Sequence, residues 1–218
     1  MVEDKFGWAR QQSLGEEIAN SISHGVGFLA AAAVTPVLII AAIPSGVAAI
    51  TGASIFGATM MILYLASTLY HAFPHTRKAK RLFQVLDHSA IFLLIAGTYT
   101  PFTLSVLKGP WGWTLFAIVW ALAIFGVVLK SVRPVGTSRL SVALYLGMGW
   151  LAVIAVQPLW NSLSAGGIFW LIAGGVMYTA GVAFFVYDHR LRYNHFIWHL
   201  FVLAGTGCHV VSILGYAY

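Results

Sequence analysis

Two histidines four residues apart are the first feature of this sequence that could do chemistry. His195 and His199 stand in the segment His-Phe-Ile-Trp-His. In a helix this spacing places both imidazoles on one face, with Cβ atoms about 6 Å apart, so that the pair can chelate a single metal ion. Neutral histidines also pair with backbone or with a neighbouring helix at packing interfaces. The pair by itself is therefore open to both interpretations.

Two other segments supply further candidate groups. His71 follows Ser67 by four residues in Ser-Thr-Leu-Tyr-His, and Asp87 stands in Val-Leu-Asp-His-Ser. Three imidazoles with a water form the open arrangement of a catalytic zinc site, whereas a closed structural site favours four protein ligands, often thiolates. The chain has a single cysteine, Cys208. It therefore has no internal disulfide, and it lacks the thiolates of a closed site.

The prediction from these residues is a Zn²⁺ site whose metal ligands are His71, His195 and His199. Asp87 is predicted as a catalytic group that orients or deprotonates a water at the metal. Ser67 is predicted as a second catalytic group, whose hydroxyl hydrogen-bonds a substrate carbonyl, a water or the Asp87 carboxylate. Imidazole sites also accept other divalent ions, so the identity of the metal stays open.

The composition around these residues is that of a membrane protein. Hydrophobic residues make up 60% of the 218-residue chain and charged residues only 8%, against about 25% charged in soluble domains. Too few charged residues are present to cover a soluble core of this size, so lipid is the expected solvent. The formal charge of +6 comes from short basic clusters between apolar runs. This pattern is typical of membrane-surface anchoring, and we expect no nucleic-acid partner.

Seven apolar runs are long enough to cross a membrane as helices. They cover residues 19–42, 47–71, 84–106, 112–130, 141–160, 166–187 and 195–217. The short connectors between them require antiparallel neighbours, so the expected fold class is all-α, a seven-transmembrane helix bundle. We expect one transmembrane domain, 19–218, after a cytoplasmic tail, 1–18. The polar start, which holds four of the six acidic residues, does not resemble a signal peptide, and we expect the first run to be retained.

The basic residues predict the orientation in the membrane. Of the twelve Lys and Arg, only Lys108 falls on the side opposite the N-terminus. Because basic residues gather on the cytoplasmic side, we expect a cytoplasmic N-terminus and an external C-terminus. His71 then ends the second run, Asp87 begins the third and the histidine pair begins the seventh, all near the cytoplasmic face. This shared depth favours the metal site over helix packing, with Asp87 as the one carboxylate at the edge of a span.

The other histidines in the apolar runs are expected to have supporting or structural roles. His24, near the cytoplasmic end of the first run, is expected to support the cluster or to contact a neighbouring helix. His88 points about 100° away from Asp87 around the helix and is expected to be structural. His209 lies two to three turns further along the last run, too deep to join the cluster, and is expected to pack or to hydrogen-bond.

Five segments together carry a resemblance to a known family. They are Ser67-Thr-Leu-Tyr-His71, Asp87-His-Ser-Ala-Ile-Phe-Leu-Leu-Ile-Ala-Gly-Thr-Tyr-Thr-Pro101, His195-Phe-Ile-Trp-His199, and, earlier, Glu16-Glu17-Ile-Ala-Asn20 and His24-Gly25. Over essentially the whole chain they resemble the haemolysin III branch of the progestin and adipoQ receptor superfamily. The resemblance implies a seven-helix fold with zinc near the cytoplasmic face, bound by the three histidines, while the Asp acts through water or as an exchangeable ligand.

The same resemblance implies a function and a location. Related eukaryotic members and the similar alkaline ceramidases are associated with the hydrolysis of ceramide-like amides, and bacterial members are linked to membrane lipid homeostasis. We therefore expect a multi-pass protein of the bacterial inner (plasma) membrane that hydrolyses a lipid amide or ester, with membrane lipids as partners and a substrate that arrives from the bilayer. The chain lacks the large soluble extension of the hormone-receptor members, which argues against a hormone-receptor role.

Two other functions compete with the hydrolase. One is a non-catalytic membrane sensor or regulator in which zinc is structural. The other is a pore-forming cytolysin, which the sequence disfavours because it has no amphipathic insertion segment and its polar groups gather at one face. The 22 glycines allow close helix packing, so a homo-oligomer is also open.

Overall fold

The computed structural model describes residues 12–74, 78–107, 109–132, 139–188 and 190–218, and its regular structure there is helical throughout. In this part of the chain seven helical segments, some of them made of two or three consecutive elements, are long and apolar enough to cross a membrane, which confirms the predicted fold class. The elements are α1 (Leu14–Ala42), η1 (Ile43–Ser45), α2 (Val47–Ala72), α3 (Lys78–Pro101), η2 (Phe102–Val106), α4 (Pro110–Val132), α5 (Arg139–Gly149), η3 (Leu151–Ala155), α6 (Val156–Ser162), α7 (Ala165–Val186) and α8 (Asn194–Tyr216).

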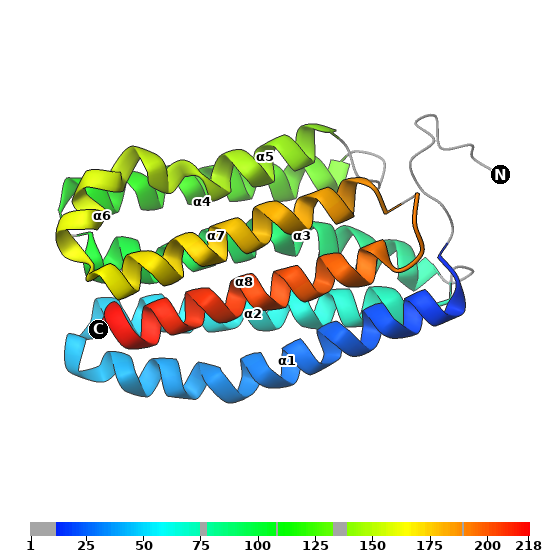
Figure 1. The fold of residues 1–218 in the computed structure, drawn as a ribbon, viewed down its shortest axis with the longest axis horizontal. Coiled ribbons are helices and arrows are strands. Elements are labelled where there is room, and N and C mark those ends of the chain that lie inside the picture. The colour runs from blue at the N-terminus through cyan, green and yellow to red at the C-terminus, as the bar shows by residue number, and fades with distance from the viewer. Residues whose placement is uncertain (1–11, 75–77, 108, 133–138, 189) are drawn as a thin grey trace.

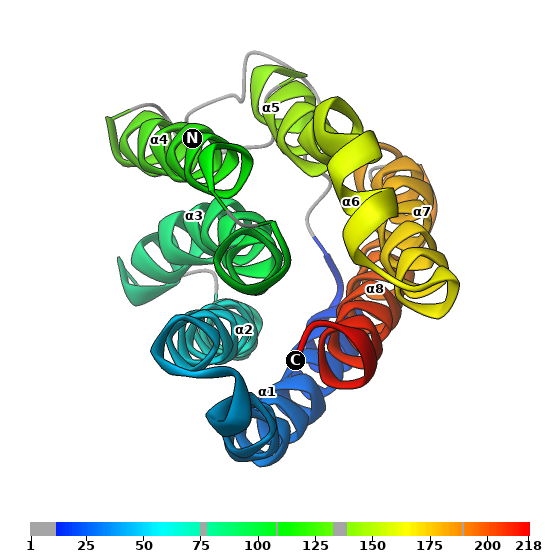
Figure 2. The same cartoon turned by 90° about the vertical axis from the view of Figure 1, so that its left-hand side faces the viewer.

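Consecutive spans run antiparallel and form a ring in chain order, which α1 and α8 close as parallel neighbours. Seen end-on, α1 to α4 follow one side, α5 to α7 the other, and α8 returns against α1 (Figure 2). The start of α1 and the end of α8 lie at opposite ends of the bundle (Figure 1). Within the described residues, every Lys and Arg lies at the end where α1 starts: Lys78, Lys80, Arg81, Lys130, Arg139, Arg190 and Arg192. This segregation is what the orientation prediction requires.

The first helix begins five residues earlier than the first apolar run. Ser13 caps α1, and the carboxylate of Glu16 accepts hydrogen bonds from the backbone amide and the hydroxyl of Ser13 at 2.9 and 2.8 Å. This reciprocal capping box starts the helix at Leu14. Glu16 and Glu17 are therefore buried helix residues. The prediction that they belong to a polar tail, leaving Asp87 as the one carboxylate at the edge of a span, was wrong.

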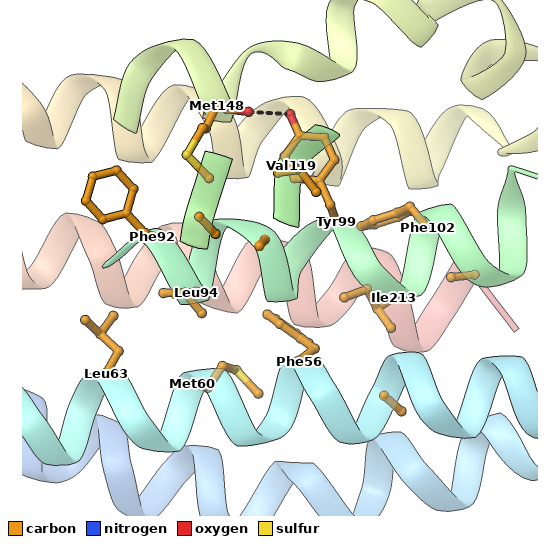
Figure 3. Packing of buried hydrophobic residues seen from close by; sticks show 14 of the residues in the cluster. Phe56, Met60, Leu63, Phe92, Leu94, Tyr99, Phe102, Val119, Met148 and Ile213 are labelled. Atoms are coloured by element: carbon orange, nitrogen blue, oxygen red, sulfur yellow. Dashed lines mark hydrogen bonds between the residues drawn. The ribbon is translucent and has the colours of Figure 1, made fainter. Parts of the chain in front are cut away.

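The fifth span is interrupted where a continuous helix was predicted. The hydroxyl of Tyr99, on α3, enters the gap between α5 and η3. It accepts from the amide of Ala152 at 2.9 Å and lies 2.9 and 2.8 Å from the carbonyl oxygens of Met148 and Gly149 (Figure 3). An inserted side chain of this kind breaks the i→i−4 ladder. Pro158, in α6, also has no amide hydrogen and so cannot donate an i→i−4 hydrogen bond.

The core that fixes the other helices lies between α2, α3, α4 and α8. Phe56, Met60 and Leu63 of α2 point toward α3, where Leu94 lies on the facing side (Figure 3). Phe92 lies on the other side of α3 and packs against Tyr145 of α5, with ring centroids 4.5 Å apart. These side chains are almost wholly shielded. Close packing of this kind holds the ends of α2, α3 and α8, which carry the candidate site, in fixed positions relative to one another.

Candidate metal centre

The three predicted ligands meet at the end of the bundle where α1 starts. His71 lies in the last turn of α2, and His195 and His199 lie in the first two turns of α8. All three are buried, and one ligand nitrogen from each lies within 4.8 Å of the others. Nitrogens at about 2.1 Å from one zinc ion are about 3.4 Å apart. The side chains therefore need only small rotations to share one ion.

His71 is held by a carboxylate from the first helix. Its Nδ1 lies 2.7 Å from Oε2 of Glu17, whose other oxygen accepts from Nζ of Lys80 at 2.5 Å. A carboxylate bound to a lysine accepts, so the hydrogen of the imidazole is on Nδ1 and Nε2 carries a lone pair. Nε2 of His71 is buried and has no hydrogen-bond partner. A buried nitrogen of this kind calls for a ligand, and a metal ion fits it.

The two histidines of α8 are held in the same way. Nδ1 of His195 lies 3.2 Å from Oδ2 of Asp188, and Nδ1 of His199 lies 3.2 Å from the carbonyl oxygen of Asn20. Ser23 adds a second contact to the same nitrogen of His199, at 3.1 Å. A carbonyl accepts and cannot donate, so His199 also has its hydrogen on Nδ1. All three imidazoles thus turn Nε2 away from their supporting groups, which is the tautomer that zinc-binding histidines use.

The two predicted catalytic residues lie beside this cluster. Asp87, in the first half of α3, is buried and interacts with His195, Ser67 and Lys130. It is outside the group of three ligand atoms. Ser67 lies one turn before His71 on α2, and its buried hydroxyl lies near the Asp87 carboxylate without making a hydrogen bond of standard geometry. The structure therefore brings both residues to the site, while their catalytic roles stay predictions.

The other histidines occupy separate positions. His24 stacks on His199, with ring centroids 3.5 Å apart and the planes 6° from parallel. It therefore contacts a neighbouring helix, which is one of the two roles expected of it. Neither ring nitrogen of His24 has a hydrogen-bond partner. His88 is buried, and its carbonyl accepts from a tyrosine hydroxyl of α5. His209 packs against the ring of Tyr178 at 5.5 Å, deeper in the bundle, as expected.

A cavity of about 340 Å³ runs from the histidines through the middle of the ring of helices. At the end near the cluster it is lined by Asp87, His195 and His199, and at the far end by Leu159 and Trp160. Most side chains between these ends are aliphatic or aromatic. The cavity thus has a polar end with titratable groups and a long apolar part, which suits an amphiphile.

The wall of the cavity is thin at the interrupted fifth span. Trp150, Val153 and Val156 line the cavity, and their side chains are also exposed, by 43%, 57% and 57%. In a membrane this surface faces lipid. The cavity therefore reaches the outside of the bundle beside the break that Tyr99 creates.

Sequence reasoning identified the three candidate ligands that the structure brings together, but it missed the groups that hold them. Glu17, Asp188 and the carbonyl of Asn20 were not recognised as partners of the histidines. For Glu17 a signal was present, because Ser13-Leu-Gly-Glu16 is a capping-box pattern and extends the helix over the two acids. For Asp188 and Asn20 no local pattern identifies the partner.

Known proteins match this chain over most of its length. A family model described as haemolysin-III related matches residues 12–210. The chain is 46% identical to Hemolysin-3 of Bacillus cereus over 206 residues, 94% of this chain and 93% of the relative. It is 45% identical to the Hemolysin-3 homolog of Bacillus subtilis (strain 168) over 205 residues, 94% and 95% of the two chains. It is 28% identical to the monocyte to macrophage differentiation factor of Homo sapiens over 168 residues, 75% and 69%.

Proposed function

This chain belongs to the haemolysin-III related family and is a multi-pass integral membrane protein, and we propose that it is a zinc-dependent hydrolase of a lipid amide or ester. One observation carries the proposal. Three buried histidines each bring one ring nitrogen to within 4.8 Å of the others, beside the polar end of an apolar cavity that also holds a buried carboxylate. His71, His195 and His199 would hold the ion.

Zinc held by three histidines supplies a Lewis acid that polarises a carbonyl and makes water acidic enough to lose a proton near neutral pH. Asp87 acts as the general base, because its buried carboxylate lies beside His195 and lines the cavity. It takes a proton as water adds to the carbonyl and gives it to the amine or alcohol that leaves when the C–N or C–O bond breaks. Ser67 orients this carboxylate or the carbonyl by hydrogen bonding.

The cavity wall supports a substrate that comes from the bilayer. A lipid that passes the exposed side chains of Trp150 and Val153 places its acyl chain in the apolar part and its carbonyl near the histidines. Because the basic residues lie at the end that holds the histidines, we place this end at the cytoplasmic face. Relatives from Bacillus species support a bacterial plasma membrane as the location.

The test is hydrolysis of a panel of N-acylated sphingoid bases and acyl esters by the zinc-loaded protein in lipid bicelles. The wild type is expected to release fatty acid, and Asp87→Asn to lower the rate by about 10²–10⁴-fold with its zinc retained. Ser67→Ala is expected to lower the rate. Its matched control is Ser89→Ala, since Ser89 is also buried without a hydrogen-bond partner but is not among the groups that act on Asp87. Turnover unaffected by Asp87→Asn would overturn the mechanism.

A second candidate function is a membrane sensor with a structural metal. It is favoured by one feature, that the candidate ligands come from α2 and α8, which lie on either side of α1, so that a bound ion would clamp two parts of the chain that are distant in sequence. Zinc binding without turnover of any amide or ester in the panel would establish this function against the hydrolase.

The names of the two Bacillus relatives point instead to haemolysis. In the described part of this chain the cavity is apolar along most of its length. A wall of this kind gives ions no polar path through the bundle, and we do not propose a pore.

A further inference from the structure

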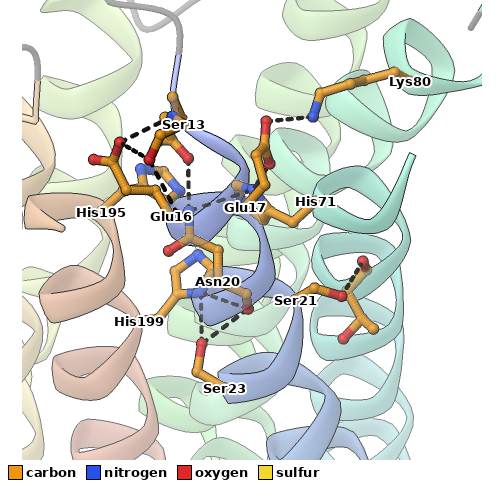
Figure 4. Close-up of polar contacts among 12 residues, drawn as sticks. Ser13, Glu16, Glu17, Asn20, Ser21, Ser23, His71, Lys80, His195 and His199 are labelled. Carbon is orange, nitrogen blue, oxygen red and sulfur yellow. Dashed lines mark hydrogen bonds and ion pairs between the residues drawn. The ribbon is translucent and has the colours of Figure 1, made fainter. Parts of the chain in front are cut away.

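The first three turns of α1 contact or support each of the three candidate ligands. This segment, Ser13–Ser23, lies between the end of α2 and the start of α8 (Figure 4). Glu17 reaches His71 and the carbonyl of Asn20 reaches His199 directly. The three candidate ligands thus come from two helices, α2 and α8, while several of the groups that orient them come from α1.

The contact to His71 is the strongest of these supports. Glu17 places one carboxylate oxygen 2.7 Å from Nδ1 of His71 and the other 2.5 Å from Nζ of Lys80. All three side chains are at most 10% exposed. Lys80 also lies over the ring of Tyr70, 4.8 Å from its centroid. A buried ionised carboxylate needs compensation of this kind, so the lysine lets Glu17 remain a charged acceptor for the imidazole.

The support for His195 passes through the backbone. Oε1 of Glu16 accepts from the amide of Tyr193 at 2.9 Å. Tyr193 caps the start of α8 in the left-handed region, with φ of 63° and ψ of 7°, which a bulky residue adopts only when its surroundings hold it there. Because His195 follows two residues later, the carboxylate of Glu16 fixes the point at which α8 and its first ligand begin.

The support for His199 comes from the third turn. The carbonyl of Asn20 and the hydroxyl of Ser23 both lie against Nδ1 of His199, at 3.2 and 3.1 Å. Ser23 donates its own hydrogen to the carbonyl of Asn20 at 2.9 Å, so it accepts from the imidazole. This pair of acceptors fixes the same tautomer that Glu17 fixes on His71.

We propose that the segment Ser13–Ser23 carries an orienting scaffold for the metal ligands, made of Glu16, Glu17, Asn20 and Ser23. Glu17 is the positioning residue for His71, and Glu16 is the positioning residue for the start of α8 at His195. This inference rests on the metal site of the proposed function and concerns binding of the ion, independently of turnover. A partner on the second nitrogen fixes the tautomer and ring orientation of a ligating histidine, and its loss typically weakens metal binding by about 10–100-fold.

The experiment measures metal affinity in the full-length protein in detergent. Metal is removed with a chelator, and Co²⁺ is titrated back while its ligand-field absorption is followed; Zn²⁺ affinity comes from competition. The variants are Glu17→Ala, Glu17→Gln and Glu16→Ala. The matched control is Ser21→Ala, because Ser21 lies in the same turns and ties α1 to α2 by donating to the carbonyl of Thr68 at 3.1 Å, without contacting a histidine.

Glu17→Ala is expected to weaken binding of both ions by about 10–100-fold and to shift the Co²⁺ spectrum, whereas Glu17→Gln, whose amide oxygen can still accept from His71, is expected to lose about tenfold. Glu16→Ala is also expected to weaken binding of both ions. Ser21→Ala is expected to leave affinity and spectrum unchanged, even if it lowers the melting temperature.

Affinities of the Glu17 variants equal to that of Ser21→Ala would overturn the scaffold while leaving the metal site in place. Glu17→Gln has nearly the shape of the native residue and decides the question if Glu17→Ala does not fold. A wild type that binds neither ion would overturn both the scaffold and the metal site. Tight metal binding without hydrolysis would overturn the hydrolase alone.

Discussion

Removing the hydroxyl of Tyr99 tests how the fifth span is broken. In a continuous helix the amide of Ala152 would donate to the carbonyl of Met148, but here the Tyr99 oxygen stands between them. Tyr99→Phe leaves the amide without an acceptor, at about 1–3 kcal/mol, and removes the hydrogen bond donated to the carbonyls, at about 0.5–1.5 kcal/mol. We expect the free energy of unfolding to fall by about 1.5–4.5 kcal/mol.

The matched control for this change is Tyr145→Phe, which deletes the same atom from an equally buried ring. The hydroxyl of Tyr145 donates to the carbonyl of His88, which lies within α3, so its loss leaves no backbone group of a broken helix unpaired. We expect it to cost about 0.5–1.5 kcal/mol. Unfolding in mixed micelles with increasing SDS gives both values. Equal losses for the two variants would refute the view that the inserted hydroxyl replaces the helix ladder.

Three further predictions concern packing, access and orientation. Gly97→Ala should lower the free energy of unfolding by about 1–3 kcal/mol in the same SDS assay, because the added Cβ would overlap Thr59. Gly207→Ala, whose Cβ would have open space around it, should leave that free energy unchanged. Equal effects of the two changes would contradict the close approach of Gly97 to Thr59. Val153→Trp should narrow the opening of the cavity and reduce turnover of bilayer lipids while zinc content stays constant; undiminished turnover would place the access route elsewhere. Alkaline phosphatase fused after Tyr218 should be active in cells, and an inactive fusion would reverse the orientation.

The helices and the meeting of the three histidines could be predicted from the sequence. Apolar runs of about 20 residues and short connectors leave an antiparallel bundle as the arrangement that satisfies the backbone in lipid. The depth of each polar residue then follows from the end of the span that carries it. This is why the sequence alone places His71 and His195 together, although more than a hundred residues separate them along the chain.

The supporting groups could not be predicted in the same way. The break in the fifth span depends on the hydroxyl of Tyr99, about fifty residues earlier in the chain. The local sequence of the fifth span does not indicate that contact. Glu17 looked like part of a solvated tail, because acids near an apolar run are usually outside the membrane. Its burial is possible because His71 and Lys80 pair with it, and these partners come from other helices.

The most direct test of the central claim is the metal content of the purified protein. Mass spectrometry on protein prepared without chelator should find about one zinc per chain in the wild type, since three protein ligands with an open position bind a single ion. A variant with alanine at His71, His195 and His199 should have none. A wild type without metal, or a triple variant that retains it, would contradict the metal centre and with it the proposed hydrolase.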